Sequence, residues 1–322
     1  MSKDVTRSAS RLRRLVEELG DSGFDLDGSD DWRALLLGEM DYALRPLVHE
    51  RRVPSVGSIV HPTTDPSGWE RGTRLRIARR DVGEMTVGAA RRFADGLSSW
   101  LIRTVDGRDE LAVFDRPAGS ERDLVVLAEV LGATLVQRHS AGPVRVVGDF
   151  GVLRWDGLSW HHEPPIAFWI DAVAACPEHG DRDVLQTLLA FAVHDLGSRG
   201  IGATLVYRPV TGPGAAFETR LPSPPALHVQ NPTDLAPLRH ALAQVDGAAV
   251  IDAEGFLREL GVRLLPSVDS ISSVEGFRGM RHTSGKRYSY DDSRATVIVV
   301  SEDGPVTVLR NGEVLGRSQA SA

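Results

Sequence analysis

The chain has 322 residues, enough for about two domains of ordinary size, and 42% of them are hydrophobic, which excludes a disordered chain. Its 37 Lys and Arg residues against 44 Asp and Glu give a net charge of −7, which argues against a surface made to coat nucleic acid or an anionic membrane. One cysteine, Cys176, excludes a disulfide framework, and without a signal peptide or a long apolar run the sequence predicts a soluble, cytoplasmic protein.

The first half of the sequence predicts a mixed α+β domain. Leu12, Leu15, Val16 and Leu19 share one face of a helix over 5–19. Further along, the expected elements are a helix over 32–44 capped by Ser29 or Asp30, an irregular loop over 53–73, an exposed strand through Leu75 and Ile77, a helix over about 84–97, a hairpin over 100–114, and a helix through Leu131 that Ser120 and Asp123 cap. The arginines between Arg71 and Arg80 favour a solvated surface, with a phosphate or ligand patch as the alternative.

The second half is richer in strands. Strands are expected over 144–147, 151–155, 166–175, 202–207, 294–301 and 306–309, and helices over 181–198 and 233–244, the second capped by Thr233. The order strand, helix, strand over 166–207 predicts a βαβ crossover. We therefore expect an α/β (α+β) fold, in which a C-terminal mixed sheet flanked by helices (146–322) follows a smaller mixed α+β domain (1–145).

Three short motifs resemble sites but lack parts that the chemistry needs. Asp25, Asp27 and Ser29 have the spacing of a calcium loop, but Asp30 stands in place of its glycine and Leu36 in place of its final glutamate. Cys176 lies near His179 in a turn that offers no third, orienting group, so a structural thiol is the better interpretation. The histidines of His161-His162 would point to opposite faces of an extended segment, so one metal site would use at most one of them.

Three polar segments of the C-terminal half carry residues that nucleotide chemistry needs. Asp246-Gly247-Ala248 places a carboxylate between a helix and a strand, and its glycine allows a ligand close to the backbone. The segment 279–287, expected to be a loop, offers cations, an imidazole and hydroxyls between glycines, which suits a triphosphate. Ser301-Glu302-Asp303 adds a second acidic cluster for a metal ion. Taken singly, each segment is also what an ordinary turn would contain.

In this order the motifs resemble the diadenylate cyclase domain of DNA-integrity-scanning proteins and membrane-bound cyclic-di-AMP synthases. The resemblance covers roughly residues 180–318. It rests on the motifs Gly202-Ala203-Thr204-Leu205-Val206, Asp246-Gly247-Ala248, Gly279-Met280-Arg281-His282 and Val297-Ile298-Val299-Val300-Ser301-Glu302.

The resemblance implies a metal-dependent nucleotidyltransferase that condenses two ATP molecules into cyclic di-AMP and two pyrophosphates, across facing protomers of a homodimer or larger homo-oligomer. By matching position, Asp246 and Glu302 would hold Mg²⁺ or Mn²⁺, and the catalytic residues would be Asp246, Gly247, Ala248, Arg281 and His282. The nucleotide-binding residues would be Gly202, Ala203, Thr204, Leu205, Gly279, Thr283, Ser284, Lys286 and Arg287. Phosphoryl transfer depends mainly on positioning and charge neutralisation, which these residue types supply.

The sequence departs from the family pattern at two positions. The usual Arg-His-Arg is Arg281-His282-Thr283 here, which removes one guanidinium, and Lys286 or Arg287 would have to supply the missing charge. Val245 stands where a histidine often precedes Asp-Gly-Ala. These departures leave open a catalytically degenerate nucleotide-binding sensor on the same fold.

The rest of the chain implies a soluble family member with an N-terminal accessory domain that senses a signal or sets the oligomeric state. We expect neither the transmembrane helices of the membrane-bound branch nor the C-terminal DNA-binding helices of the scanning branch. A nucleic-acid-binding regulator that uses the arginine-rich N-terminus is a third class, which no helix-turn-helix, zinc-finger or RNA-recognition motif supports.

Overall fold

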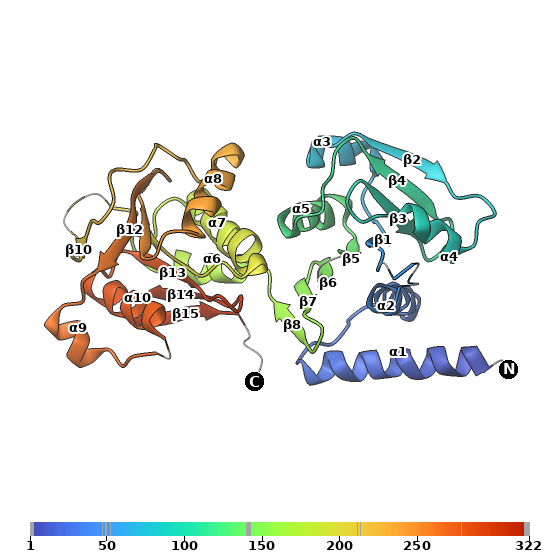
Figure 1. Ribbon diagram of the computed structural model, residues 1–322, viewed down its shortest axis with the longest axis horizontal. Coiled ribbons are helices and arrows are strands. Elements are labelled where there is room, and N and C mark those ends of the chain that lie inside the picture. Colours follow the sequence, from blue (N-terminus) through green and yellow to red (C-terminus); the bar gives the residue numbers. More distant parts are fainter. Residues whose placement is uncertain are drawn as a thin grey trace. The chain divides into compact units, whose positions relative to one another are not determined.

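The computed structural model describes residues 3–318 apart from 47, 49, 52, 140–142, 211, 213 and 278. The chain divides into two compact units, Met1–Pro165 and Ile166–Ala320 (Figure 1). This division lies beyond the expected boundary at 145, because the strands that follow residue 143 pair with the first sheet. The first unit is therefore not the smaller of the two.

The first unit is built on a mixed sheet whose strand order, in the described residues, is β2-β4-β3-β1-β5-β6-β7-β8. The strands are β1 (Val56–Val60), β2 (Ile77–Asp81), β3 (Ser99–Arg103), β4 (Glu110–Phe114), β5 (Thr134–Arg138), β6 (Val144–Gly148), β7 (Gly151–Trp155) and β8 (Trp160–Glu163). The helices are α1 (Lys3–Asp21), α2 (Asp30–Leu44), α3 (Trp69–Thr73), α4 (Val87–Ala90) and α5 (Glu121–Leu131), with 3₁₀ turns at Pro66–Gly68 and Arg91–Phe93. As expected, Ser29 caps α2, and Ser120 and Asp123 form a capping box at α5.

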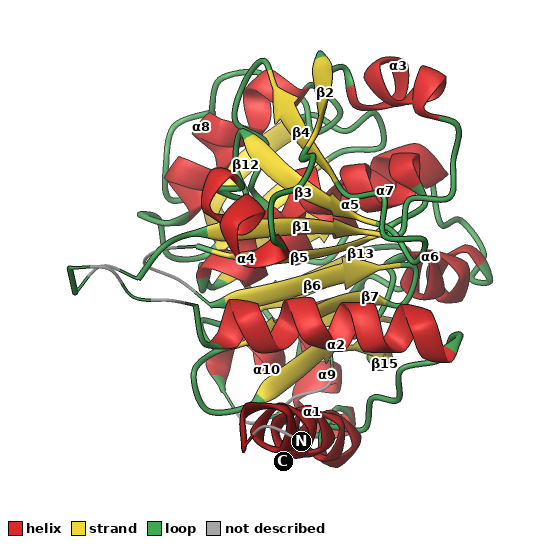
Figure 2. Ribbon diagram, turned by 90° about the vertical axis from the view of Figure 1, so that its right-hand side faces the viewer, coloured by secondary structure: helices red, strands yellow, loops and turns green. Residues whose placement is uncertain are grey.

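Alternating side chains of the central strands form the two cores of this unit. Ile59 and Leu135 pack with α5, whereas Val60 and Val136 pack with α1 and α2, because successive residues of a strand point to opposite faces. Helix α2 lies along β1, β5 and β6 (Figure 2). The result is a three-layer arrangement that buries both faces of the sheet.

Three expectations for this unit are wrong. The predicted loop over 53–73 contains β1, which pairs with β3 on one side and β5 on the other. Gly57 is typical of a loop and so favoured the wrong prediction. The strand needs a glycine at this position, because a Cβ on Gly57 would lie 2.3 Å from the Cα of Gly96. The predicted helix over 84–97 is only the single turn of α4 and a 3₁₀ turn. Val16, expected to face inward, is 48% exposed.

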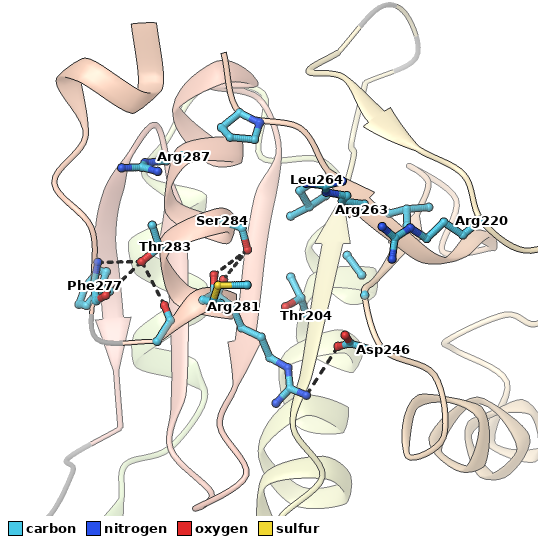
Figure 3. A pocket seen from close by; sticks show the side chains of 16 residues that line it. Thr204, Arg220, Asp246, Arg263, Leu264, Phe277, Arg281, Thr283, Ser284 and Arg287 are labelled. Atoms are coloured by element: carbon cyan, nitrogen blue, oxygen red, sulfur yellow. Dashed lines mark hydrogen bonds and ion pairs between the residues drawn. The ribbon is translucent and has the colours of Figure 1, made fainter. Parts of the chain in front are cut away.

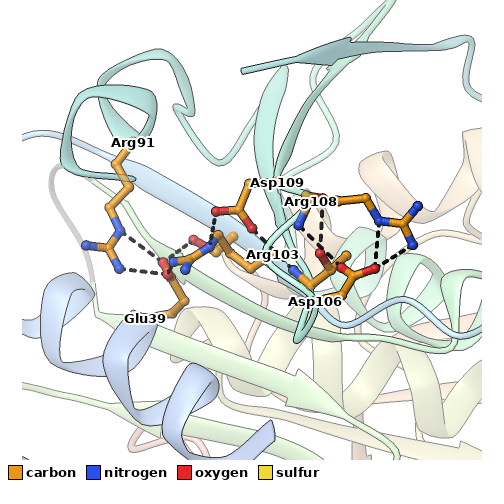
Figure 4. A network of polar contacts seen from close by, with 8 residues as sticks. Glu39, Arg91, Arg103, Asp106, Arg108 and Asp109 are labelled. Carbon is orange, nitrogen blue, oxygen red and sulfur yellow. Dashed lines mark hydrogen bonds and ion pairs between the residues drawn. The ribbon is translucent and has the colours of Figure 1, made fainter. Parts of the chain in front are cut away.

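A buried ion-pair network ties α2 to the sheet of the first unit. The Glu39 carboxylate accepts hydrogen bonds from Arg91 over 2.7 and 3.1 Å and from the Ser58 hydroxyl of β1 over 2.7 Å. Arg103 of β3 also donates to Glu39 and pairs with Asp109 over 2.9 Å (Figure 4). Because Glu39 is 1% exposed, these partners are what makes its charge tolerable inside the protein.

A second network joins α5 to β7 and β8. Arg154 donates to Glu121 over 2.6 and 2.8 Å and lies 3.5 Å from the Glu163 carboxylate. Burial alone would lower the pKa of Arg154, but the two carboxylates raise this pKa above its ordinary value. The arginine therefore stays charged and serves the fold.

The second unit has the strand order β10-β12-β11-β9-β13-β14-β15 in the described residues. The strands are β9 (Ala203–Tyr207), β10 (Phe217–Glu218), β11 (Ala248–Ile251), β12 (Leu257–Leu264), β13 (Thr296–Val300), β14 (Val306–Arg310) and β15 (Glu313–Arg317). The helices are α6 (Ala167–Ala174), α7 (Arg182–Ala190), α8 (Pro232–Leu242), α9 (Val268–Ser273) and α10 (Met280–Asp291); after α7 the chain continues through a π-helical turn (Phe191–Leu196) and a 3₁₀ turn (Gly197–Arg199).

Helices again cover both faces of this sheet. On one face, Leu205 and Ile251 pack with α6, α7 and α8. On the other face, Val206 and Val250 pack with α10 through Tyr288, whose pKa burial raises to about 12. None of the helices in the described part of the chain combines the length and apolar character that a membrane span needs.

Several expectations for the second unit need correction. The predicted strand over 166–175 is helix α6, so the predicted βαβ crossover over 166–207 is wrong, and the parallel strands joined by a helix are β9 and β11, linked through α8. Asn231, not Thr233, caps α8. The predicted loop over 279–287 is the first part of α10, which begins at Met280 after Gly279 with φ at +98°.

Candidate functional site

The polar segments singled out in the sequence meet at one edge of the second sheet. Ala248 of β11 lies opposite Thr204 of the parallel strand β9, and Val300 of the antiparallel strand β13 lies opposite Ala203. The residues before β9 and β11 therefore lie beside those that follow β13. This geometry gathers Gly202, Asp246 and Glu302 without any of them being close in sequence.

A cavity of about 730 Å³ opens at this edge between α10 and strands β9, β11 and β12 (Figure 3). Its size is in the range of small-molecule sites, roughly 300–1,000 Å³. The expected residues that line it are Thr204, Asp246, Gly247, Ala248, Gly279, Arg281, Thr283, Ser284 and Arg287. The lining residues that the sequence did not indicate are Arg220, Val262, Arg263, Leu264, Pro266, Phe277 and Met280.

Arg281 links the two acidic residues of the site. Its Nη1 donates to Glu302 Oε1 over 2.9 Å, and its Nη2 lies 3.9 Å from Asp246 Oδ1 (Figure 3). Gly202 makes room for this pair, because a Cβ there would lie 2.3 Å from Arg281 Nη1. An adjoining hollow of about 370 Å³ is lined by all four of these residues. Both carboxylates are solvent-exposed, so the ion pairs hold Arg281 at a surface that ligands can reach.

The glycine of Asp246-Gly247-Ala248 allows a close approach of two strands. Gly247 has φ at +110°, and a Cβ there would lie 2.7 Å from the Gly261 carbonyl carbon and 2.8 Å from the Val262 carbonyl oxygen. The space beside this glycine is thus filled by β12. Close strand approach therefore gives this position a need for glycine that the sequence did not indicate.

Only alternate residues of the segment from Gly202 to Leu205 face the candidate site. Thr204 lines the cavity on the α10 face, while Ala203 and Leu205 are buried in the core under α7 and α8. The alternation of a strand produces this division. Ala203 and Leu205 therefore do not line the cavity, although the resemblance assigned them to the nucleotide pocket.

The hydroxyls of α10 are used within the helix. Thr283 Oγ1 accepts from the Phe277 amide over 3.1 Å and lies 3.0 Å from the Gly279 carbonyl oxygen, so it fastens the turn that leads into α10. The Ser284 hydroxyl donates to the Met280 carbonyl over 2.9 Å. Both side chains border the cavity, but backbone groups of the protein already occupy part of their hydrogen-bonding capacity.

His282 and Lys286 do not line the cavity. The His282 Nε2 lies 3.3 Å from the Thr307 hydroxyl of β14, and burial, assisted by Arg317, lowers the pKa of its imidazole. The Lys286 ammonium lies 5.2 Å from the centroid of the Phe277 ring. Helical spacing explains their position, since residues 282 and 286 lie on a different side of α10 from 280, 284 and 287.

Two arginines of the cavity were missed by sequence reasoning. Arg263 lies on β12, an edge-proximal strand that was not among the expected elements, and Arg220 follows β10. Both come within 3.9–4.0 Å of Glu218. No local motif marks them, because they reach the cavity only through the pairing of β10 with β12.

The donor set fits a metal ion that arrives with a phosphate-bearing ligand. Within the described residues no cluster of three or more His, Cys, Asp or Glu side chains could hold a metal by itself. Asp246 is 93% exposed and its contact with Arg281 is loose, which suits the one- or two-carboxylate ligation that Mg²⁺ uses together with substrate phosphates. Glu302 is engaged by Arg281 over a shorter distance, so its carboxylate is less available.

The chain thus has two α/β domains, and the second carries a polar cavity where the ends of its strands meet α10. Residues 13–163 match the family described as "Probable sensor domain DACNK", and residues 191–314 match "DisA bacterial checkpoint controller nucleotide-binding", the DAC family. The chain therefore carries a DAC domain at its C-terminus behind an N-terminal DACNK sensor domain, which confirms the resemblance derived from the motifs.

Other comparisons add little. No curated protein matches the chain. Among solved structures, one described as the hypothetical membrane spanning protein from Bacillus cereus is 18% identical, covers 44% of this chain and 73% of its own, and has a TM-score of 0.33. A likeness of that size carries no argument about the fold or the function.

Proposed function

We propose that the protein is a diadenylate cyclase, which condenses two ATP molecules into cyclic di-AMP and releases two pyrophosphates. The observation that carries the proposal is the match to the DAC family over residues 191–314, which contain the cavity with Asp246 and Arg281 at its edge. The arginines that line the cavity suit a triphosphate, because guanidinium groups bind phosphate oxygens with paired hydrogen bonds.

In this proposal each 3′-oxygen attacks the α-phosphorus of the other ATP, and the bond from that phosphorus to its bridging oxygen breaks as pyrophosphate leaves. Asp246 accepts the hydrogen bond of the attacking hydroxyl and receives its proton. Arg281, held by Glu302 over 2.9 Å, neutralises charge on the phosphate, so Glu302 acts as a positioning residue. A Mg²⁺ or Mn²⁺ ion bound by Asp246 and the phosphates would supply further charge neutralisation.

The reaction needs a second protomer, because two nucleotides must face each other for the ring to close. The exposure of the site supports this arrangement. Asp246 is almost fully exposed, and Met280 at the cavity wall and Val268 on the neighbouring α9 expose 89% and 82% of their surface. Apolar side chains this exposed around a polar cavity suit an interface with another copy of the chain.

The direct test is incubation of the purified protein with ATP and either Mg²⁺ or Mn²⁺, followed by mass spectrometry of the products. Cyclic di-AMP is expected with at least one metal, and Asp246→Asn is expected to reduce its formation by at least 100-fold while the circular dichroism spectrum stays unchanged. The absence of cyclic dinucleotide with both metals, despite measurable ATP binding, would contradict the proposal that the protein is a diadenylate cyclase.

A catalytically degenerate nucleotide sensor is the second candidate. It is favoured by Thr283, which contributes no cation where the family has one and whose hydroxyl fastens the turn at Phe277. This candidate predicts ATP binding without product, so the same incubation distinguishes the two.

A further inference from the structure

Arg287 is a guanidinium of the cavity for which the described part of the chain provides no hydrogen-bond or ion-pair partner. It borders the cavity, and no hydrogen bond or ion pair joins it to any of the described residues. Its Nε is enclosed without an acceptor. An enclosed charged donor left without an acceptor is unfavourable, so the arrangement favours a bound anion that would accept from it.

The position of Arg287 on α10 indicates which part of a nucleotide it would meet. Met280, Ser284 and Arg287 follow one another along the helix face that borders the cavity. Arg287 lies six residues beyond Arg281, about 9 Å further along the helix axis at 1.5 Å per residue. A nucleotide whose α-phosphate lies near Asp246 and Arg281, and which runs along α10 within the cavity, would bring its outer phosphates to Arg287.

We propose that Arg287 binds the outer phosphates of the nucleotide and supplies the positive charge that is missing at Thr283. This inference rests on the proposed function to the extent that a nucleoside triphosphate occupies the cavity. Thr283 lies one helical turn before Arg287, about 6 Å along the axis. A guanidinium at 287 therefore enters the same cavity from the next turn of the same helix face.

The structure also decides between the two cations that the sequence left open. Lys286 lies over the Phe277 ring and does not border the cavity, whereas Arg287 does. Adjacent helical residues differ in direction by about 100°, at 3.6 residues per turn, and at this point of α10 residue 287 lies on the cavity side whereas residue 286 does not. Arg287 also offers the planar, two-pronged donor set that matches phosphate oxygens.

Thr283 has a structural role, which explains why this position does not carry the arginine of the family motif. Its hydroxyl accepts from the Phe277 amide and lies 3.1 Å from the Phe277 carbonyl oxygen. These contacts close the turn that leads into α10 through Gly279. An arginine at position 283 could not make these hydroxyl contacts with Phe277. The threonine therefore keeps the turn closed, and the positive charge is supplied from position 287.

Calorimetric titration with α,β-methylene-ATP, which the reaction cannot cleave, and with AMP tests the inference in the presence of Mg²⁺. The full-length protein should bind the triphosphate analogue at least tenfold more tightly than AMP. Arg287→Ala should weaken binding of the analogue by about tenfold, or 1.4 kcal/mol, and change AMP binding by less than twofold. Arg287→Lys should restore part of the loss.

Lys286→Ala is the matched control, and it should change neither affinity by more than twofold. The inference would be overturned if the unmodified protein bound the analogue and AMP equally well. It would also be overturned if Arg287→Ala weakened the binding of both ligands equally, or if Lys286→Ala weakened binding of the analogue as much as Arg287→Ala does. A protein that shows the expected affinities but forms no cyclic dinucleotide from ATP would contradict the proposed function and leave the role of Arg287 intact.

Discussion

The arginines of the two units have different surroundings. In the first unit, Arg91 and Arg103 share the buried Glu39 carboxylate, and Arg154 donates twice to Glu121. In the second unit, Arg220 and Arg263 at the cavity have only a carboxylate at 3.9–4.0 Å, and Arg287 has no partner among the described residues. A guanidinium that has a buried carboxylate serves the fold, and one that lacks it is available to a ligand.

Arg281 lies between these two cases. It pairs with Glu302, yet both side chains are partly exposed and Asp246 is only loosely attached. Exposed ion pairs contribute about 0–1 kcal/mol to stability, so this pair positions a functional group more than it holds the fold together.

The largest effect is expected from removing the centre of the buried network. Glu39→Ala leaves Arg91 and Arg103 buried without their carboxylate, which should destabilise the first unit by about 3–5 kcal/mol. Urea unfolding followed by tryptophan fluorescence reports on this unit, because every tryptophan except Trp169 lies in it. Glu17→Ala, which breaks an exposed helical pair with Arg13, is the control and should cost less than about 0.5 kcal/mol. Similar losses in the two variants would contradict the claim that the buried network around Glu39 stabilises the first unit more than an exposed ion pair does.

The next effect concerns the positioning of Arg281. Gly202→Ala should push the guanidinium away from Glu302, because the new Cβ would lie 2.3 Å from Nη1. We expect cyclic di-AMP formation to fall about tenfold, equal to about 1.4 kcal/mol, with stability nearly unchanged. Glu302→Gln should give a similar loss. Since both act through Arg281, the double variant should be no worse than either one, and additive losses would contradict a shared mechanism.

A smaller effect is expected at Arg263. Arg263→Ala should leave stability within about 0.5 kcal/mol, because the side chain is 63% exposed. It should weaken binding of the triphosphate analogue a few-fold at low salt and less at high salt, where exposed charges are screened. The matched control is Arg258→Ala on the same strand, whose guanidinium pairs with Asp252 outside the cavity. An equal loss in the control would show that only overall charge matters.

The smallest effect is a pH dependence from His282. Burial, followed by the charge of Arg317, lowers the pKa of this imidazole below 6.5, so folding favours the neutral ring. Its contribution to stability is complete above about pH 6.5 and is lost as the pH falls through the folded-state pKa. Urea unfolding followed by circular dichroism between pH 7.5 and 5.5 should show that the free energy of unfolding declines less steeply with falling pH in His282→Asn than in the unmodified protein. Identical declines would exclude His282 as the source.

The sequence was a good guide where local chemistry decides the structure. The caps at Ser29 and Ser120, the hairpin of β3 and β4, and the apolar face of α7 follow from residues close in sequence. The motif at Asp246 and the family could be recognised for the same reason. The motifs at Asp246 and Ser301 were correctly placed at strand ends, whereas the segment 279–287 is part of helix α10 and not a loop.

The misassigned elements are those whose structure tertiary packing determines. The stretch 166–175 is aromatic and β-branched enough to resemble a strand, but Trp169, Ile170 and Val173 bury one helical face. Helix α10 has two unfavourable features, a polar composition and Gly285. That glycine allows α10 close to the sheet, since a Cβ there would lie 3.0 Å from the Val299 side chain. Neither contact is visible from local sequence.

For the site, the sequence located the edge of the sheet but not the side of each element. Ala203, Leu205, His282 and Lys286 were grouped with the nucleotide-binding residues because they belong to the motifs, and strand alternation or helical rotation turns them away from the cavity. Arg220 and Arg263 were missed for the converse reason, since they enter the cavity from the segment after β10 and from β12, which lie outside every motif.

The most direct test of the central claim is the product profile of the purified full-length protein with ATP, GTP and an equal mixture, resolved by mass spectrometry. The account predicts cyclic di-AMP from ATP, with two pyrophosphates released for each molecule, and loss of both products in Asp246→Asn. Nucleotide that binds but is recovered unchanged from all three incubations, with either Mg²⁺ or Mn²⁺, would contradict it.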